Sequence, residues 1–194
     1  MSSLMDRSRR ARFEIGFAVM PEDPDLVVML LADLATAPRR DVPVGRSIRR
    51  FEPGDGLAWV AIHRAAGGDE EHDADQFAHE FGGSQGDLRD RQFFALDAQE
   101  QPIGTATAWF AQPETSRALG RLGRLHWLAV VPEHQRLGVG SALTSAVLDR
   151  LLDLGCESAY LTSSVRRQGA LRLYEQFGFV RTPVRDVLAV EHAR

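Results

Sequence analysis

Lysine is absent from this 194-residue chain, and all 23 of its basic residues are arginines. The absence excludes a lysine Schiff base, and it excludes a phosphate-binding loop of the Walker type, which requires a lysine. Cysteine occurs once, at Cys156, so an internal disulfide and a thiolate metal cluster are excluded as well. A lone thiol suits a reducing compartment; we therefore expect a cytoplasmic protein in which Cys156 is buried and inert.

Long hydrophobic runs are also missing. A membrane-spanning helix needs roughly 20 consecutive apolar residues, and no window of this chain approaches that length. Residues 1–20 are basic and then partly apolar, but Glu14 interrupts them and no small-residue cleavage pattern follows, so we do not expect a signal peptide. The net charge is only -4 and no nucleic-acid motif is present. We therefore expect neither a membrane nor a nucleic acid as partner.

The length suits a single globular domain. We place that domain at residues 47–194 and treat residues 1–46 as an N-terminal extension that is packed on the core or partly mobile. Within the extension, the apolar run Leu26–Leu34 follows Pro24, and this pattern predicts a short helix.

Hydrophobic spacing and turn residues predict an alternation of strands and helices along the rest of the chain. This order predicts an α/β or α+β fold with a mixed sheet. Strands are expected at 48–51, 92–96, 103–110, 125–131, 159–162, 179–181 and 186–190, and helices at 57–66, 77–81, 139–154 and 169–177.

The most informative segment is the turn between strand 125–131 and the long helix that follows it. Gly138 and Gly140 stand where this turn opens onto the helix. A helix start presents unpaired N–H groups and the positive end of the helix dipole, and glycine lets an anion approach them closely. Arg136 adds a charge-assisted donor. A plain turn at the start of a helix is the alternative explanation of the two glycines.

A dinucleotide-binding fingerprint does not fit this segment. That fingerprint needs a third glycine where Leu143 stands, and it needs an acidic residue at the end of the next strand, where Ser163 and Ser164 stand.

Two motifs of the chain resemble those of one enzyme family. Gln135-x-x-Gly138-x-Gly140, preceded by Leu128-Ala129-Val130-x-Pro132, is similar to motif A of the GCN5-related N-acetyltransferases (GNAT). The segment Ala170-Leu171-Arg172-Leu173-Tyr174-Glu175-Gln176-Phe177-Gly178-Phe179 resembles the Ala-x-x-Leu-Tyr-x-x-x-Gly-Phe motif of the same family. The resemblance covers residues 48–190. It implies a mostly antiparallel sheet of six to seven strands flanked by helices, in which strands 125–131 and 159–163 splay apart to form the acetyl-CoA cleft.

The resemblance also implies roles for individual residues. Main-chain groups of Leu128 to Val130 would bind the pantetheine arm, with the Val130 N–H polarising the thioester carbonyl. Tyr174 matches the tyrosine that protonates the departing thiolate; the alternative is a tyrosine packed in the core. Arg167 stands where the family often has an asparagine, and it either meets phosphates or is solvated. The expected cofactor-binding residues are Leu128, Ala129, Val130, Gln135, Arg136, Leu137, Gly138, Val139, Gly140, Ser141 and Arg167.

For the general base we favour His126. In regular strand alternation it shares a face with Leu128 and Val130, and the ordinary pKa of histidine, about 6.5, suits proton transfer near neutrality. The strand also resembles that of the arylalkylamine N-acetyltransferases, in which a histidine is the base, although Arg124 stands where that group has a second histidine. The alternatives are a histidine that is only hydrogen-bonded at a strand edge, or a water held by another residue.

The acceptor side is less defined by the sequence. By the resemblance, Asp75, His79, Glu80 and Phe81 are expected wall residues. The acidic segment 69–75 attracts a cationic amine or is only a solvated loop. Its histidines and acids match no standard ligand spacing, so we expect no metal.

The resemblance implies an enzyme that transfers the acetyl group of acetyl-CoA to a primary amine by direct attack in a ternary complex. The acceptor is a small-molecule amine or the amine of a protein or peptide, and a homodimer is compatible with the sequence. The alternative function is a non-catalytic acyl-CoA-binding sensor or regulatory module of the same fold.

Overall fold

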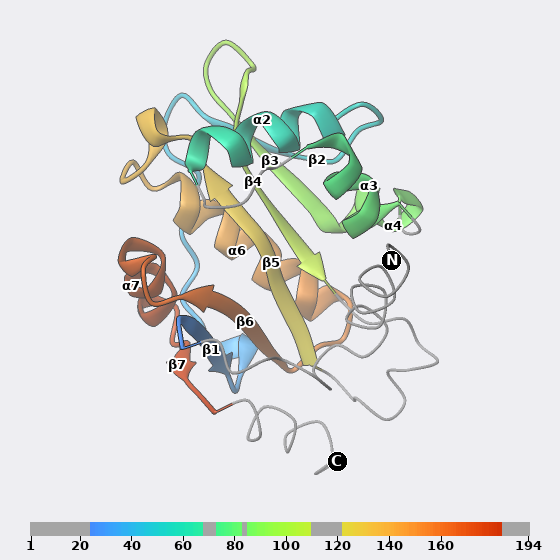
Figure 1. Ribbon diagram of the computed structural model, residues 1–194. Helices are drawn as coiled ribbons and strands as arrows, with labels where there is room; N and C mark the ends of the chain where they lie inside the picture. The colour runs from blue at the N-terminus through green and yellow to red at the C-terminus, as the bar shows by residue number, and fades with distance from the viewer. Residues whose placement is uncertain (1–23, 68–72, 83–84, 110–121, 184–194) are drawn as a thin grey trace, which may run out of the picture.

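Seven strands of the described residues form one sheet in the order β2-β3-β4-β5-β6-β1-β7 (Figure 1). The computed structural model describes residues 24–67, 73–82, 85–109 and 122–183. Its strands are β1 (Leu26–Leu31), β2 (Ser47–Arg50), β3 (Gln92–Leu96), β4 (Pro102–Trp109), β5 (Leu122–Val130), β6 (Ser158–Ser164) and β7 (Val180–Arg181). Its helices are the 3-10 turns η1 (Leu34–Thr36) and η2 (Pro132–His134), and α2 (Gly56–Ala66), α3 (Ala74–Phe81), α4 (Gln85–Arg91), α6 (Val139–Asp153) and α7 (Gln168–Gln176).

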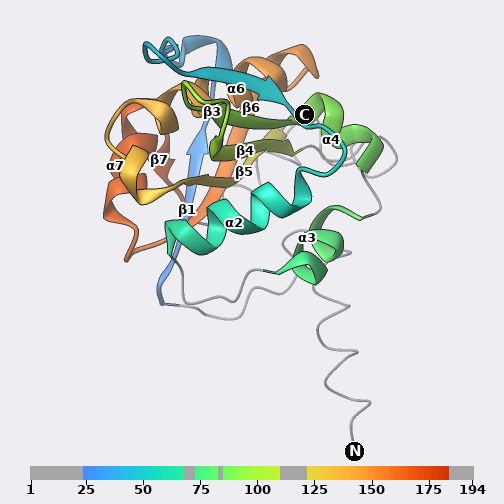
Figure 2. The same ribbon diagram turned by 90° about the horizontal axis from the view of Figure 1, so that it is seen from above.

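The strands pair in antiparallel fashion except for β5 and β6, which run parallel. A parallel pair needs a crossover connection, and α6 provides it on one face of the sheet. Its residues Val139, Leu143, Val147 and Leu151 recur every four positions, and each is at most 2% exposed. Helices α2 and α3 cover the opposite face, as Figure 2 shows. The fold is thus the predicted helix-flanked, mostly antiparallel sheet.

The apolar run near the N-terminus was predicted to be a helix, and this prediction is wrong. Residues 26–31 form strand β1, which lies between β6 and β7 and pairs with both, instead of a helix. Five of its six residues are buried. A strand buried on both faces is as continuously apolar as a buried helix, so periodicity alone does not separate them. Because β1 belongs to the same sheet, the sheet extends across the boundary that we drew at residue 46.

The structure adds one helix to the predicted elements and leaves one expected strand untested. Helix α4 was missed because its sequence, Gln-Gly-Asp-Leu-Arg-Asp-Arg, has a single apolar residue and therefore no apolar stripe. The strand expected at 186–190 lies outside the described residues. The hairpin between β3 and β4 is confirmed, and the Asp97 carboxylate accepts hydrogen bonds from the N–H groups of Gln99 and Gln101 in its turn.

Cys156 lies in the core and is 2% exposed. Burial raises the pKa of its thiol to about 11, so the thiol stays protonated and unreactive at neutral pH. No helix in the described ranges is both long enough and apolar enough to span a bilayer.

The placement of β1 generates a stability prediction. Met29 is fully buried in the core that α6 covers, so Met29→Ala leaves a cavity and lowers the free energy of unfolding by about 2–5 kcal/mol. Val44→Ala is the control, since Val44 is 97% exposed and its replacement changes stability by less than about 0.5 kcal/mol. Urea denaturation measures both, and equal midpoints would contradict the placement of β1 in the core.

Candidate active site

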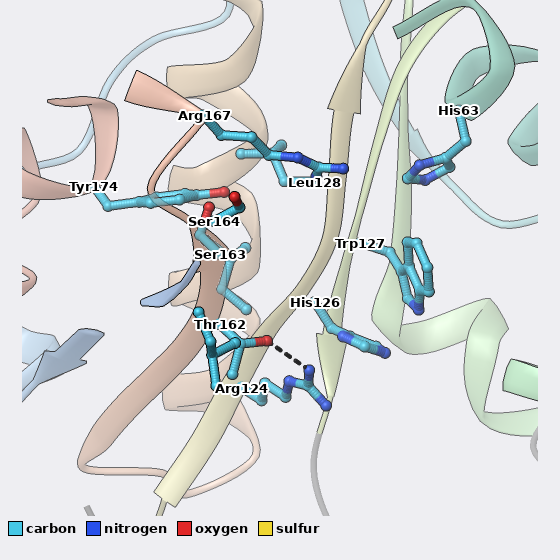
Figure 3. Close-up of a pocket in the computed structure, with 12 residues that line it drawn as sticks. His63, Arg124, His126, Trp127, Leu128, Thr162, Ser163, Ser164, Arg167 and Tyr174 are labelled. Atoms are coloured by element: carbon cyan, nitrogen blue, oxygen red, sulfur yellow. Dashed lines mark hydrogen bonds between the residues drawn. The ribbon is translucent and has the colours of Figure 1, made fainter. Parts of the chain in front are cut away.

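The central feature of the site is the point at which β5 and β6 stop pairing. Their parallel pairing runs from Leu122↔Ser158 to Arg124↔Tyr160 and then ends. Both strands continue, β5 to Val130 and β6 to Ser164. The splay expected between these strands is therefore present. It opens a pocket lined by Leu26, His63, Arg124, Leu125, His126, Trp127, Leu128, Thr162, Ser163, Ser164, Arg167 and Tyr174 (Figure 3).

A β-bulge interrupts β5 beside this pocket. Thr105 pairs with Ala129 and Thr107 pairs with His126, so Trp127 and Leu128 together face Ala106. Trp127 has a φ of 51°, a left-handed conformation that costs energy for a residue with a bulky side chain.

The bulge corrects our argument for His126. We expected it to share a face with Leu128 and Val130, but those two pack into the core on the α6 side. His126 instead packs with Phe81 of α3, on the opposite face. The extra residue in β5 shifts the alternation by one position, so that side chains before and after the bulge no longer follow a single period of two.

His126 lies in a nearly closed aromatic and acidic environment. Its side chain is 12% exposed and contacts the rings of Phe81, Trp109 and Trp127. Its Nε2 lies 3.6 Å from Oε2 of Glu80, and the same oxygen accepts a hydrogen bond of 3.2 Å from Nε1 of Trp127. Burial lowers the pKa of His126 well below 6.5, and the positive charges of Arg124 and His63 lower it further. The imidazole is therefore neutral at physiological pH and can accept a proton.

The four predicted acceptor-side residues separate into two pairs. Glu80 and Phe81 point to the sheet from α3 and contact His126. Asp75 and His79 are exposed on the same helix. None of the four is among the residues that line the pocket. Residues 69–72 of the acidic segment lie outside the described residues.

Tyr174 approaches the pocket from the other side, on α7 (Figure 3). Its ring packs edge-on against Phe179 with a centroid distance of 6.1 Å, and the side chain is buried. Burial raises the pKa of the Tyr174 phenol to about 12, an effect that the charge of Arg167 opposes. The phenol is thus protonated at neutral pH and can donate a proton.

The turn before α6 combines two left-handed residues with an exposed helix start. Arg136 has a φ of 59° and Gly138 a φ of 85°. The first of the helix's own hydrogen bonds runs from the N–H of Ala142 to the carbonyl of Gly138. The amides of residues 139–141 therefore have no acceptor within the helix, and they form a site for an anion.

Gln135 and Gly140 have roles that the sequence did not reveal. The side-chain amide of Gln135 donates a hydrogen bond of 2.9 Å to the carbonyl of Val130, which ties the turn to the end of β5. A Cβ on Gly140 would lie 3.3 Å from Leu173 of α7. Glycine at 140 therefore permits close packing of α6 against α7. We expected this glycine to let an anion approach the start of the helix; the close neighbour in the structure is the side chain of Leu173.

Backbone groups of β5 are open to the pocket beyond Arg124. The N–H of Val131 donates to Ile103 of β4, and successive N–H groups of a strand point to opposite edges. The N–H of Val130 therefore points to the edge that faces away from β4. No strand in the described ranges pairs with that edge beyond Arg124.

Arg167 caps the start of α7, and its side chain extends across the pocket toward Leu128 (Figure 3). The neighbouring Arg166 forms an ion pair of 2.8 Å with Asp25. Only Arg167 of the two lines the pocket.

Sequence reasoning did not single out His63, Trp127 or Thr162, which also line the pocket. His63 packs edge-on against Trp127 with a centroid distance of 5.2 Å. No local sequence pattern links α2 to β5, because the two elements are far apart in the chain and come into contact only when α2 packs on the face of the sheet.

Comparisons with known proteins agree with this geometry. The model of the acetyltransferase (GNAT) family matches residues 57–179. A mycothiol acetyltransferase from Streptomyces griseus is 33% identical over 151 residues, which cover 71% of this chain and 44% of that protein. The chain spans about half the length of the acetyltransferases that it matches in this way.

Solved structures share the fold. A GCN5-related N-acetyltransferase from Sphaerobacter thermophilus superposes with a TM-score of 0.67 and 21% identity, covering 81% of this chain and 48% of that one. The ribosomal-protein-S18-alanine N-acetyltransferase from Escherichia coli gives a TM-score of 0.57 and 22% identity, covering 71% of this chain and 79% of that one. At such identities the likeness is evidence of the fold alone.

Proposed function

Because this chain belongs to the acetyltransferase (GNAT) family, we propose that it transfers the acetyl group of acetyl-CoA to a primary amine by direct attack within a ternary complex. The observation that carries the proposal is the pocket between β5 and β6. An open strand edge, a neutral imidazole and a protonated phenol surround this one space.

The residues around the pocket fit acetyl-CoA as a substrate. The free amides at the start of α6, with Arg136 beside them, suit the pyrophosphate, and Arg167 adds a second positive charge at the pocket. The open edge of Leu128 to Val130 suits the amide groups of the pantetheine arm, which would bind as an added strand. The N–H of Val130 then donates to the thioester oxygen, where negative charge develops during attack.

Proton transfer completes the proposed reaction. Neutral His126 takes a proton from the acceptor ammonium or from the attacking amine, and Glu80 stabilises the imidazolium that results. A nitrogen–carbon bond forms and the carbon–sulfur bond breaks. Tyr174 donates a proton to the departing thiolate, and its raised pKa keeps that proton available until the sulfur takes it.

Thiol release from acetyl-CoA with a panel of amines tests the function. We expect release that depends on the amine, and we expect Tyr174→Phe to lower kcat by about 100-fold because the thiolate then leaves without a donor. The affinity for CoA, measured by calorimetry, should be unchanged in the variant. Tight CoA binding without transfer to any amine would favour the acyl-CoA-binding sensor instead, and equal kcat for both proteins would remove Tyr174 from the mechanism.

The pH dependence of kcat tests the role of His126. A base acts only when unprotonated, so activity declines as the pH falls through its pKa. Because burial lowers the pKa of His126, we expect the acid limb of kcat to have its midpoint below pH 6.5 at saturating substrates. His126→Gln should lower kcat by about 100-fold and abolish this limb. Tyr174→Phe should keep it. A limb that persists in His126→Gln would identify another group as the base.

Paired glycine substitutions test the phosphate-binding turn. Gly138 and Gly155 have φ values of 85° and 84°, so alanine at either position costs about 1–2 kcal/mol of backbone strain. Only Gly138 borders the amides at the start of α6, and a Cβ there would lie 3.1 Å from Pro43. We expect Gly138→Ala to weaken CoA binding by about tenfold or more, near 1.4 kcal/mol, and Gly155→Ala to leave it unchanged. Equal affinities in the two variants would place the pyrophosphate elsewhere.

A further inference from the structure

We propose that Arg124 binds an anionic group on the acceptor, so that the amine substrate carries a carboxylate or a phosphate as well as its reacting nitrogen. This inference rests on the proposed acetyl transfer, because it names the class of amine that the pocket accepts. Neither the family motifs nor the predicted acceptor residues include Arg124.

Arg124 stands where the pocket closes. It is the last residue of β5 that pairs with β6, opposite Tyr160. Its Nη2 donates a hydrogen bond of 3.0 Å to the hydroxyl of Thr162 (Figure 3). Its guanidinium carbon lies 5.6 Å from the centre of the Tyr160 ring. These two contacts from β6 hold the guanidinium in one orientation, so the charge is placed before a ligand arrives.

Arg124 has no carboxylate partner in the part of the chain that the structure describes. The ion pairs among these residues do not include Arg124, and its Nε is buried without a hydrogen-bond partner. The described residues that line the pocket include no Asp or Glu. A guanidinium has five N–H donors in a planar fork that matches a carboxylate or a phosphate, and a buried donor without an acceptor is destabilising. The missing partner of Arg124 is therefore an anion that enters the pocket.

This anion differs from the pyrophosphate of acetyl-CoA. Arg124 pairs with Trp109 and Val130 pairs with Gly104, which is five residues away on β4; at about 3.3 Å per residue the two lie roughly 16 Å apart along the sheet. The turn that suits the pyrophosphate follows Val130, at the far end. The cofactor's phosphates at that turn thus lie far from Arg124.

Arg124 is instead close to the proposed base. Before the bulge β5 alternates regularly, so Arg124 and His126 project from the same face. The charge of Arg124 contributes to the lowered pKa of His126, in keeping with this proximity. An acceptor whose anionic group binds Arg124 presents its nitrogen toward His126 and the thioester. The positively charged pocket thus selects a substrate that carries a negative group. The sequence had instead suggested that the acidic segment 69–75 attracts a substrate through its positive charge.

Matched pairs of amines test the inference. One pair is an amino acid and its amide, and another is ethanolamine phosphate and ethanolamine; the two pairs separate carboxylate from phosphate recognition. In the wild-type protein we expect kcat/KM to be about 10- to 100-fold higher for the anionic member of one pair, the range of a charge-assisted hydrogen bond. Arg124→Gln should abolish this preference, mainly through KM, and Arg124→Lys should retain part of it.

The possible results separate this inference from the proposed function. Equal kcat/KM for both members of each pair in the wild type would overturn the role of Arg124, and so would an equal loss for both members in Arg124→Gln. If no amine is acetylated, the proposed function fails on its own. Calorimetry then tests the anion site directly, with an N-acetyl amino acid and its amide as probes. Binding of the acid alone, lost in Arg124→Gln and kept in Arg124→Lys, supports the site, and the absence of any difference overturns it.

Discussion

The end of backbone pairing between β5 and β6 is the constraint on which the rest of the site depends. If β5 and β6 continued to pair beyond Arg124, the strand edge that faces the pocket would be occupied by β6 and no pocket would exist. After Arg124, no strand in the described ranges pairs with this edge of β5. The free edge therefore suits the ligand that we propose for it, a pantetheine arm whose amide groups can pair with the strand.

Because of the bulge at Trp127, His126 and Leu128 project from opposite faces of the sheet. The bulge turns His126 toward Glu80 and the aromatic side chains of α2 and α3, and leaves Leu128 packed toward α6. Burial then acts in opposite directions on the two titratable groups. It lowers the pKa of His126 and raises that of Tyr174, so that one is an unprotonated acceptor and the other a protonated donor at the same pH.

The pocket has two arginines, one from each side of the splay. Arg167 lies at the start of α7, and the proposed phosphate-binding amides at the start of α6 are outside the pocket lining. The guanidinium of Arg124, held by Thr162, faces a pocket to which the described residues contribute no carboxylate. Strand β1 flanks β6 on its other edge, where Leu26 to Leu31 pair with Ser164 to Ala159, and Leu26 lines the pocket. Residues on the N-terminal side of the family match thus help to shape the pocket.

The sequence by itself determined the elements that depend on local pattern. Neighbouring residues determine the helical period of α6, the hairpin of β3 and β4 and the turn at Gly138. The two sequence motifs were likewise enough to identify the family. Only the tertiary structure decided what depends on distant partners. The run at residues 26–31 became a strand because β6 and β7 offered it hydrogen bonds on both edges. His126 lies on the opposite face from the expected one because of one extra residue in β5. Arg124 lacks an ion-pair partner because the described chain brings no carboxylate to the pocket. Spacing along a chain encodes the periods of helices and strands, whereas a bulge or a missing counter-charge is a property of what the folded chain brings together.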